Sequence, residues 1–174
     1  METVPTLTTT RFTMRPLQPG DEHVLFKSYS DPDLMRYWSR GPFDNVNDLR
    51  SWLFDRGWGG RTWVAVPHAG GDPVLRVIAS EAGREISEIG YMIVPGHERQ
   101  GIARECLTAL ITHLFRVDGV HRIFGDVDPR NIPSNRLLEG LGFTREAHLR
   151  DAMKTHLGWC DTWLWGLLED EWSL

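Results

Sequence analysis

The chain has 174 residues, of which 41% are hydrophobic and 25% charged, and its formal net charge is −5. These values fit one globular domain over residues 1–174 with a substantial core, and they exclude a chain that is disordered throughout. Lys and Arg are not in excess, which argues against nucleic acid as a partner, whereas an acidic surface suits a cationic substrate.

The sequence carries no signal for export, membrane insertion or metal binding. Residues 1–5 have neither the basic start nor the apolar stretch of a signal peptide. No apolar run approaches the roughly 18 residues of a membrane helix. Cys106, Cys160 and the seven histidines lack the spacing of metal ligands. We therefore expect a cytoplasmic protein with no metal and no membrane partner, and both a monomer and a homodimer stay open.

The first 60 residues predict one strand followed by three helices. Residues 11–17 alternate apolar and polar side chains, as a half-buried strand does. Capping residues then mark short helices at 21–30, at 31–38, and from about 45 through 53, the last of which Gly57 is expected to end. The expected caps are Asp21, Asp31, and either Asp44 or Asn45.

From residue 62 onward, strands predominate around one long helix. Turn residues separate the expected strands, which lie at 62–67, 74–80, 86–94, 120–127, 143–149 and 162–168. Apolar side chains at three- and four-residue spacing predict an amphipathic helix from Ala103 to about Asp118, and 134–140 is a shorter helix. This order predicts a mixed α/β domain around one mostly antiparallel sheet.

The segment from Glu88 to Arg104 combines a strand, a tight turn and the start of the long helix. The first turn of a helix has unpaired N–H groups and the positive end of the dipole, which together bind phosphate. Gly101 and the small Ala103 allow a phosphate to approach the main chain, and Arg99 and Arg104 add positive charge. An ordinary turn before an ordinary helix explains the same residues, because short glycine motifs are frequent.

A second segment, Asp128 to Phe143, follows the next expected strand. Asn131 is expected to cap its helix, Pro133 fits the first turn, and Gly142 fits the C-terminal end. Together the two segments resemble the GCN5-related N-acetyltransferases, the GNAT superfamily. The resemblance is to the branch that includes the ribosomal-protein N-terminal acetyltransferases RimJ and RimL. Three further stretches resemble that branch: Leu7–Leu17, Ser30-Asp31-Pro32, and the end of the chain from Arg150.

The resemblance implies a splayed GNAT sheet that holds acetyl-coenzyme A between two neighbouring strands. Backbone groups of Met92, Ile93 and Val94 are then expected to pair with the pantetheine arm, which Asn131 faces from the other wall. An N–H near Met92 or Ile93 is expected to stabilise the oxyanion. The pyrophosphate is expected on the amides of the turn, which are those of Arg99, Gln100, Gly101, Ile102, Ala103 and Arg104.

Two positions depart from the family's pattern. The motif Gln/Arg-x-x-Gly-x-Gly/Ala falls on residues 98–103, so the acidic Glu98 takes its first position. We expect that side chain to point outward or to pair with an arginine. Leu138 stands where many relatives have a tyrosine acid, and the branch that lacks this tyrosine has a serine, placed like Ser134, nearer the thioester.

Three side chains are candidates for proton transfer. Glu88 is the first candidate base, because it shares a strand face with Gly90 and Met92 on the strand that the resemblance puts beside the thioester. Asp126 occupies the place where some N-terminal acetyltransferases of the family have a glutamate. Ser134 is suited to hydrogen-bond the departing sulfur. A solvated carboxylate at Glu88 and a simple capping hydroxyl at Ser134 remain alternative interpretations.

Three functions stay open. The first is acetyl transfer to a protein N-terminal amine. The second is transfer to a small amine such as a polyamine, amino acid or aminoglycoside, and the third is an acyl-CoA-binding module without turnover. Gly101, Asn131 and Ser134 favour an enzyme. An open acceptor groove would fit the first function and a closed pocket the second. By resemblance, His156 and Trp159 line the acceptor rim, near a region with four tryptophans: Trp38, Trp52, Trp58 and Trp63.

Overall fold

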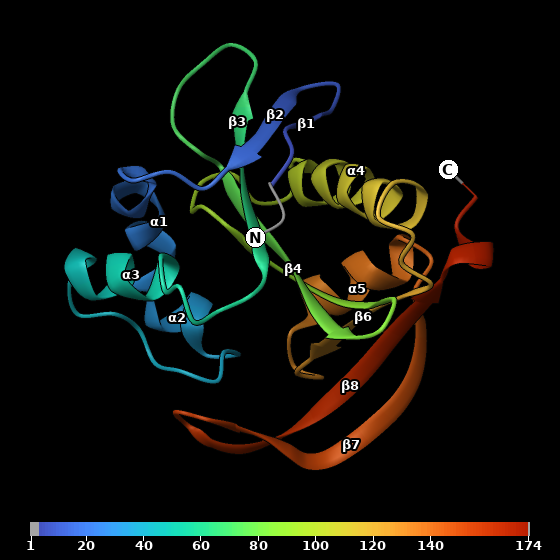
Figure 1. The fold of residues 1–174 in the computed structure, drawn as a ribbon. Coiled ribbons are helices and arrows are strands. Elements are labelled where there is room, and N and C mark those ends of the chain that lie inside the picture. Colours follow the sequence, from blue (N-terminus) through green and yellow to red (C-terminus); the bar gives the residue numbers. More distant parts are fainter. Residues whose placement is uncertain (1–3, 174) are drawn as a thin grey trace.

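A computed structural model describes residues 4–173, which form one eight-stranded sheet with helices on both faces (Figure 1). The elements in chain order are β1 (Leu7–Thr8), β2 (Phe12–Pro16), α1 (Asp21–Tyr29), α2 (Pro32–Met35), α3 (Val46–Leu53), β3 (Arg61–Pro67), β4 (Leu75–Gly83), β5 (Ile86–Ile93), α4 (Ile102–Arg116), β6 (Arg122–Val127), α5 (Ile132–Gly140), β7 (Thr144–Thr155), β8 (Gly158–Leu168) and a final 3₁₀ turn, Glu169–Glu171. The expected α/β class with one mostly antiparallel sheet is therefore confirmed.

The strands are ordered β1-β2-β3-β4-β5-β6-β8-β7 across the sheet. Every neighbouring pair is antiparallel except β5 and β6, which α4 connects as a parallel pair. Within residues 4–173, no helix is long and apolar enough to cross a membrane.

Side-chain caps begin two of the three helices between β2 and β3. The Asp31 carboxylate accepts hydrogen bonds from the N–H groups of Asp33 and Leu34, at 2.7 and 3.3 Å. Of the two caps that the sequence left open for α3, Asn45 is the one used, and its Oδ1 accepts from Asp48 N at 3.0 Å. Each such cap typically stabilises a helix by about 1 kcal/mol.

The expectation that Asp21 caps α1 is wrong. Gly20, with a φ of 109°, takes the N-cap position. The Asp21 carboxylate instead binds the Arg15 guanidinium through two contacts of 2.7 Å. The same carboxylate also accepts from Gln18 N at 2.8 Å, and the pairing with Arg15 is the stronger contact because both partners carry a charge. The second helix also ends earlier than expected, at Met35, and Tyr37 therefore lies in the loop after it.

The sheet buries a separate core on each face. On one face the apolar stripe of α4 packs on the central strands, and Ile89 of β5 belongs to this core. On the other face α1, α2 and α3 cover Val64, Met92 and Val94. The alternation of side chains along β5 thus divides it between the two cores. The α4 stripe comprises Ile102, Cys106, Leu107, Leu110, Ile111, Leu114 and Phe115.

The β7–β8 hairpin is longer than the sequence predicts. The strand expected at 143–149 continues to Thr155, with a register shift between Leu149 and Met153. Because β7 is an edge strand with both faces largely exposed, its side chains show no apolar alternation to mark its length. The hairpin forms one edge of the sheet, along the bottom of Figure 1, and its turn lies near the loop after α2. There a Cβ added at Gly41 would lie 3.4 Å from the His156 ring.

A buried asparagine fixes the start of α5. The side-chain Nδ2 of Asn135 donates to the carbonyl oxygens of Asp128 and Asn131, at 3.1 and 2.9 Å. Its Oδ1 accepts from the Trp165 indole at 2.9 Å. The side chain therefore joins the end of β6, the first turn of α5 and β8. This network positions Ser134, the preceding residue on the helix.

Candidate active site

The two central parallel strands part soon after they meet. Pairing between β5 and β6 covers three residues on each strand and ends at Glu88 and Phe124. Beyond that point β5 remains paired with β4 up to Ile93, and β6 remains paired with β8 up to Val127. Each strand therefore keeps its outer partner and loses its inner one. A gap opens between two intact strands in the middle of the sheet.

The backbone of β5 presents alternate residues to this gap. The N–H of Val94 donates to the carbonyl of Val74, at 2.9 Å, on the β4 side. Because successive N–H groups of a strand point to opposite edges, those of Ile93 and Tyr91 point toward the gap. This corrects part of the expectation: the amides of Val94 and Met92 face β4. Ile93 keeps its expected place, and Tyr91 N–H becomes the donor nearest the middle of the gap.

The turn that leads into α4 concentrates backbone N–H groups. Gly101 is the N-cap of α4, with a φ of 74°, and no side chain caps the helix. Arg99 and Gly96 also have positive φ, 59° and 91°. Left-handed residues in such a turn curl the main chain so that neighbouring N–H groups converge, which favours an anion. The first turn of α4 thus has no side-chain cap and suits an anion such as phosphate.

An arginine that the sequence analysis missed supports this turn. The Nη2 of Arg11 donates to the Gln100 carbonyl at 3.0 Å, and its Nε binds Glu105 at 2.7 Å. Burial acts to raise the pKa of Glu105, but hydrogen bonds from Thr9 and Arg11 outweigh it and lower that pKa. Arg11 thus places a positive charge beside the turn. It does so although it lies 94 residues from Glu105, its ion-pair partner, in the sequence.

Two side chains of the turn are directed away from it. Arg104, expected to add charge there, donates from Nη2 to the Gly140 carbonyl at 2.7 Å and so connects α4 to the end of α5. Glu98 is exposed and accepts a hydrogen bond from Gly96 N at 2.9 Å. It is therefore folded back on its own turn and pairs with no arginine among residues 4–173.

The two candidate carboxylates lie on the same face of the sheet, opposite α4. Glu88 is the last residue of β5 that pairs with β6, and Asp126 follows two residues after its partner Phe124. Burial and the negative charge of Asp126 raise the pKa of Glu88. Asp126 is exposed to water, but the surrounding protein desolvates it enough to raise its pKa too. A carboxylate with a raised pKa is a stronger base near neutral pH.

Tyr91 and Ser134 face each other across the gap. Their hydroxyl oxygens lie 2.5 Å apart, and the Tyr91 hydroxyl is 3.4 Å from the Ser134 carbonyl oxygen. Burial raises the pKa of Tyr91 to about 12, although the hydrogen bond to Ser134 acts to lower it. The phenol therefore stays protonated. When Tyr91 donates to Ser134, the serine's own proton is free for another acceptor.

The Asn131 side chain caps α5, as the sequence predicts, through one of its two polar atoms. Its Oδ1 accepts from Ser134 N at 3.3 Å and caps α5. The structure thus brings Glu88, Asp126 and Ser134 around one gap, with the α4 turn at one end. It adds Tyr91 and Arg11, whose roles depend on partners far away in sequence.

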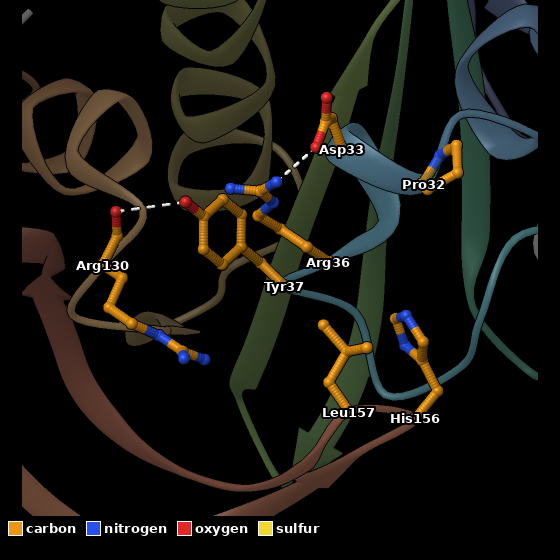
Figure 2. A pocket seen from close by; sticks show the side chains of 7 residues that line it. All are labelled: Pro32, Asp33, Arg36, Tyr37, Arg130, His156 and Leu157. Atoms are coloured by element: carbon orange, nitrogen blue, oxygen red, sulfur yellow. Dashed lines mark hydrogen bonds and ion pairs between the residues drawn. The ribbon is translucent and has the colours of Figure 1, made fainter.

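A surface pocket of about 430 Å³ lies beside the start of α5 (Figure 2). Its walls come from α2 and the loop after it, from Arg130, and from His156 and Leu157 in the β7–β8 turn. Figure 2 shows the Tyr37 ring pointing toward the Arg130 backbone, and the Tyr37 hydroxyl donates to the Arg130 carbonyl at 3.3 Å. His156, which the resemblance puts at the acceptor rim, lines this pocket.

A sequence model of the acetyltransferase (GNAT) domain matches residues 11–144, well over half of the chain. The chain belongs to the GNAT family. This GNAT protein is an acetyl-CoA-dependent N-acetyltransferase, as family members with this domain are.

Three relatives are similar to this chain, and the names of two of them state an acceptor. N-acetyltransferase p20 of Bacillus licheniformis is 32% identical over 97% of this chain and 98% of its own. Spermidine N(1)-acetyltransferase of Vibrio cholerae is 23% identical, over 80% of this chain and 82% of its own. The ribosomal protein uS5 alanine N-acetyltransferase of Escherichia coli is 33% identical, over 49% of this chain and 44% of its own.

Solved structures share the whole GNAT fold. A GNAT acetyltransferase from Bacillus anthracis superimposes with a TM-score of 0.87 at 24% identity, over 95% of this chain and 99% of its own. Spermidine N-acetyltransferase from Vibrio cholerae, solved with CoA and spermine, gives a TM-score of 0.80 at 21% identity, over 92% and 96% of the two chains. These likenesses establish the splayed fold that the sequence resemblance implied.

Replacing Gly101 with aspartate should lower acetyl-CoA affinity by roughly 100-fold or more, because a carboxylate would enter the anion-binding turn. Gly119→Asp is the matched control. It has the same left-handed backbone, with a φ of 68°, open space around it, and a place beyond the other end of α4. Calorimetry on both folded variants should find a loss only at Gly101. Equal affinities in the two variants would contradict the phosphate assignment.

The Glu98→Gln variant should change acetyl-CoA affinity less than about fivefold, the usual effect of a screened surface charge. The physical reason is that the carboxylate is exposed and bonded to Gly96. Titrating coenzyme A at two ionic strengths checks this. A salt-sensitive gain of tenfold would mean that Glu98 faces the phosphates.

Proposed function

We propose that this enzyme transfers the acetyl group to a primary amine in the gap between β5 and β6, and that the preferred acceptor is a protein N-terminal α-amine. The observation that supports this most strongly is the parting of the strands after Glu88 and Phe124. It creates two unpaired strand edges beside two carboxylates of raised pKa. An extended arm fits such an edge, and an amine fits such carboxylates.

Acetyl-CoA binding follows from the backbone in this proposal. The amides from Arg99 to Arg104 hold the pyrophosphate, where no side chain competes for the first turn of α4. The N–H of Ile93 pairs with the pantetheine arm, and the Ile93 carbonyl accepts a hydrogen bond from the Ser28 hydroxyl at 2.9 Å. Tyr91 N–H donates to the thioester carbonyl oxygen as negative charge develops there. The Asn131 side-chain Nδ2 remains free to face the arm, because capping uses only its oxygen.

The reaction needs one proton removed and one leaving group stabilised. The amine nitrogen forms a bond to the carbonyl carbon, and the C–S bond breaks. Glu88 takes the proton that the amine loses, with Asp126 as the second candidate base. The thiolate accepts a hydrogen bond from the Ser134 hydroxyl, which Tyr91 orients. A thiol with a pKa near 8.5 leaves readily, so a hydroxyl suffices here.

An α-amine acceptor agrees with the strength of these bases. Its pKa is near 8, so about one-tenth is neutral at pH 7, whereas a free lysine is neutral in only about one molecule in a few thousand. The partial match to the uS5 alanine acetyltransferase supports membership of the RimJ/RimL-like branch. A small-amine acceptor is the second candidate, since the match to the spermidine enzyme covers more of the chain. A binding module without turnover would have no need of two desolvated carboxylates.

The test is turnover with a panel of amines that contains N-terminal peptides, N-terminally blocked lysine peptides and spermidine, with acetyl-CoA as donor. We expect the unblocked peptides to have the highest kcat/KM. Binding of acetyl-CoA without turnover of any amine would favour the binding module instead.

The Glu88→Gln variant should lower kcat by roughly 10²-fold at pH 7, because the amine loses its base. The loss should shrink at high pH, where the free amine deprotonates without help. Glu81→Gln, at the exposed end of β4, is the control and should retain full activity. A near-normal rate in Glu88→Gln would mean that Glu88 is not the general base and would leave Asp126 as the candidate.

The same substitution should stabilise the protein. The pKa of Glu88 is raised in the folded state, so its ionisation opposes folding as the pH rises above the unfolded value of about 4.3. Thermal unfolding of Glu88→Gln should therefore occur at higher temperature than wild type at pH 8. The difference should disappear below about pH 4, where both states of the wild-type carboxyl are protonated.

Tyr91→Phe should lower kcat by about tenfold and leave acetyl-CoA affinity unchanged, since it removes one hydrogen bond to Ser134 and no backbone group. Ser134→Ala should show at least the same loss, and the double variant should lose little more, because the two hydroxyls act as a unit. Single-turnover kinetics measures these rates. Additive losses in the double variant would rule out a shared role.

A further inference from the structure

The pocket of Figure 2 has Arg130, from the loop between β6 and α5, in its wall. Arg130 follows Asp126 by four residues, which an extended chain spans in at most about 14 Å. The hydrogen bond from Tyr37 to the Arg130 carbonyl joins the loop after α2 to the start of α5. On the other side, Gly41 packs on His156. A short extended peptide with its amine at the carboxylates is therefore long enough to reach this pocket.

The carboxylates at this pocket are already engaged. Asp128 lies behind the wall, its side chain is 1% exposed, and Arg130 binds it at 2.8 Å through its N–H and at 2.9 Å through Nε. Asp33 is ion-paired with Arg36. Both carboxylates, the buried Asp128 and the 79% exposed Asp33, are thus already paired with an arginine.

The guanidinium groups are, by contrast, available. The Arg130 side chain is 65% exposed and that of Arg36 is 48% exposed. Each guanidinium has five N–H donors, and the ion pairs leave several of them unused. The ring of His156 adds a further donor to the same pocket. The wall that a ligand contacts is therefore rich in donors, although the protein as a whole has a net charge of −5.

Two more arginines stand on the same face of the sheet. Arg76 is opposite Met92 on β4, is only 4% exposed, and donates from Nη1 to the Tyr29 hydroxyl at 2.8 Å, while its Nε has no partner. The Arg40 guanidinium lies 3.3 Å from the centre of the Phe43 ring. Neither arginine forms an ion pair in the part of the chain that the structure describes. Both positive charges repel a polyamine that approaches this side.

From this arrangement we infer that the acceptor amine belongs to a molecule with an anionic group, a carboxylate several bonds from the reacting nitrogen, which Arg36 and Arg130 bind. This inference rests on the proposed function and names its substrate class: an N-terminal peptide with acidic residues after the first position. Arg–carboxylate pairing of this kind is directional and often bidentate, so it fixes the acceptor's orientation as well as its charge.

The test uses C-terminally amidated peptides that differ only at positions 2 and 3: Ala-Glu-Glu-Gly, Ala-Gln-Gln-Gly and Ala-Lys-Lys-Gly. Free glutamate and spermidine serve as small-molecule arms. We expect kcat/KM to fall in the order Glu, Gln, Lys, with at least tenfold between the first and the last at low salt. High salt should compress this range, because it screens the exposed guanidinium groups.

Arg36→Gln and Arg130→Gln should each reduce the Glu-to-Lys ratio several-fold, mainly through KM. Arg84→Gln is the charge-matched control. Arg84 is 92% exposed on the turn between β4 and β5. The backbone of this turn is held by a hydrogen bond from Arg122 N, at the start of β6, to the Glu85 carbonyl. This control should keep the wild-type ratio. Melting temperatures of the Arg130 variant separate a folding defect, caused by the unpaired Asp128, from a binding defect.

Calorimetry of the same peptides, with coenzyme A present, gives a readout that does not depend on turnover. Preferential binding of the Glu peptide without any acetylation would support the anion site and contradict the proposed function. Acetylation of the Lys peptide or spermidine at least as fast as the Glu peptide would overturn the inference and leave the proposed function standing. A Glu-to-Lys ratio that is unchanged in both arginine variants, or no measurable binding of the Glu peptide, would also overturn it.

Discussion

The structure depends on two parallel strands that share three residues of pairing and then separate. A strand edge inside a sheet normally has its N–H and C=O groups satisfied by a neighbour. Here β5 and β6 keep their outer neighbours and leave inner edges open from Ile89 and Gly125 onward. Such an edge is unfavourable unless a ligand completes it, so the gap is predisposed to bind an extended molecule.

The elements that border the gap are held by contacts made elsewhere. Asn135 anchors the start of α5 to β6 and β8, and this determines where Ser134 stands. Arg11 anchors the α4 turn from the N-terminal side. Rigid support of this kind matters, because a catalytic group displaced by about 1 Å loses a large part of its effect. The site's precision is thus supplied by residues that need not touch a substrate.

Charge is distributed unevenly around the site. Two carboxylates of the same face, Glu88 and Asp126, are partly desolvated, which disfavours their ionised forms and strengthens them as bases. Farther out, the carboxylates are neutralised by arginines, whose remaining donors face the solvent. The overall acidity of the chain therefore says little about the charge that an acceptor meets. Local pairing decides it, because screening limits exposed charges to a range of about 10 Å.

The sequence by itself determined the elements whose signals are local. The apolar spacing of α4 and the capping role of Asn131 depend on neighbours within a few residues, and so does the cap of α3, which the sequence narrowed to Asp44 or Asn45. The same holds for the family motifs, so the fold class was predictable from the residues and their resemblance, and the roles of Glu88, Asp126 and Ser134 stay predictions.

Only the tertiary structure decided what depends on distant partners. Asp21 binds Arg15 instead of capping α1. The length of the edge strand β7 could not be predicted, because its side chains show no apolar alternation. The Tyr91–Ser134 contact joins residues 43 apart, and the pocket wall joins Tyr37 to a carbonyl 93 residues away. The strand edge to which an amide points depends on which neighbour pairs with it. The spacing of side chains along the sequence does not predict such contacts, because they form only when the sheet is assembled.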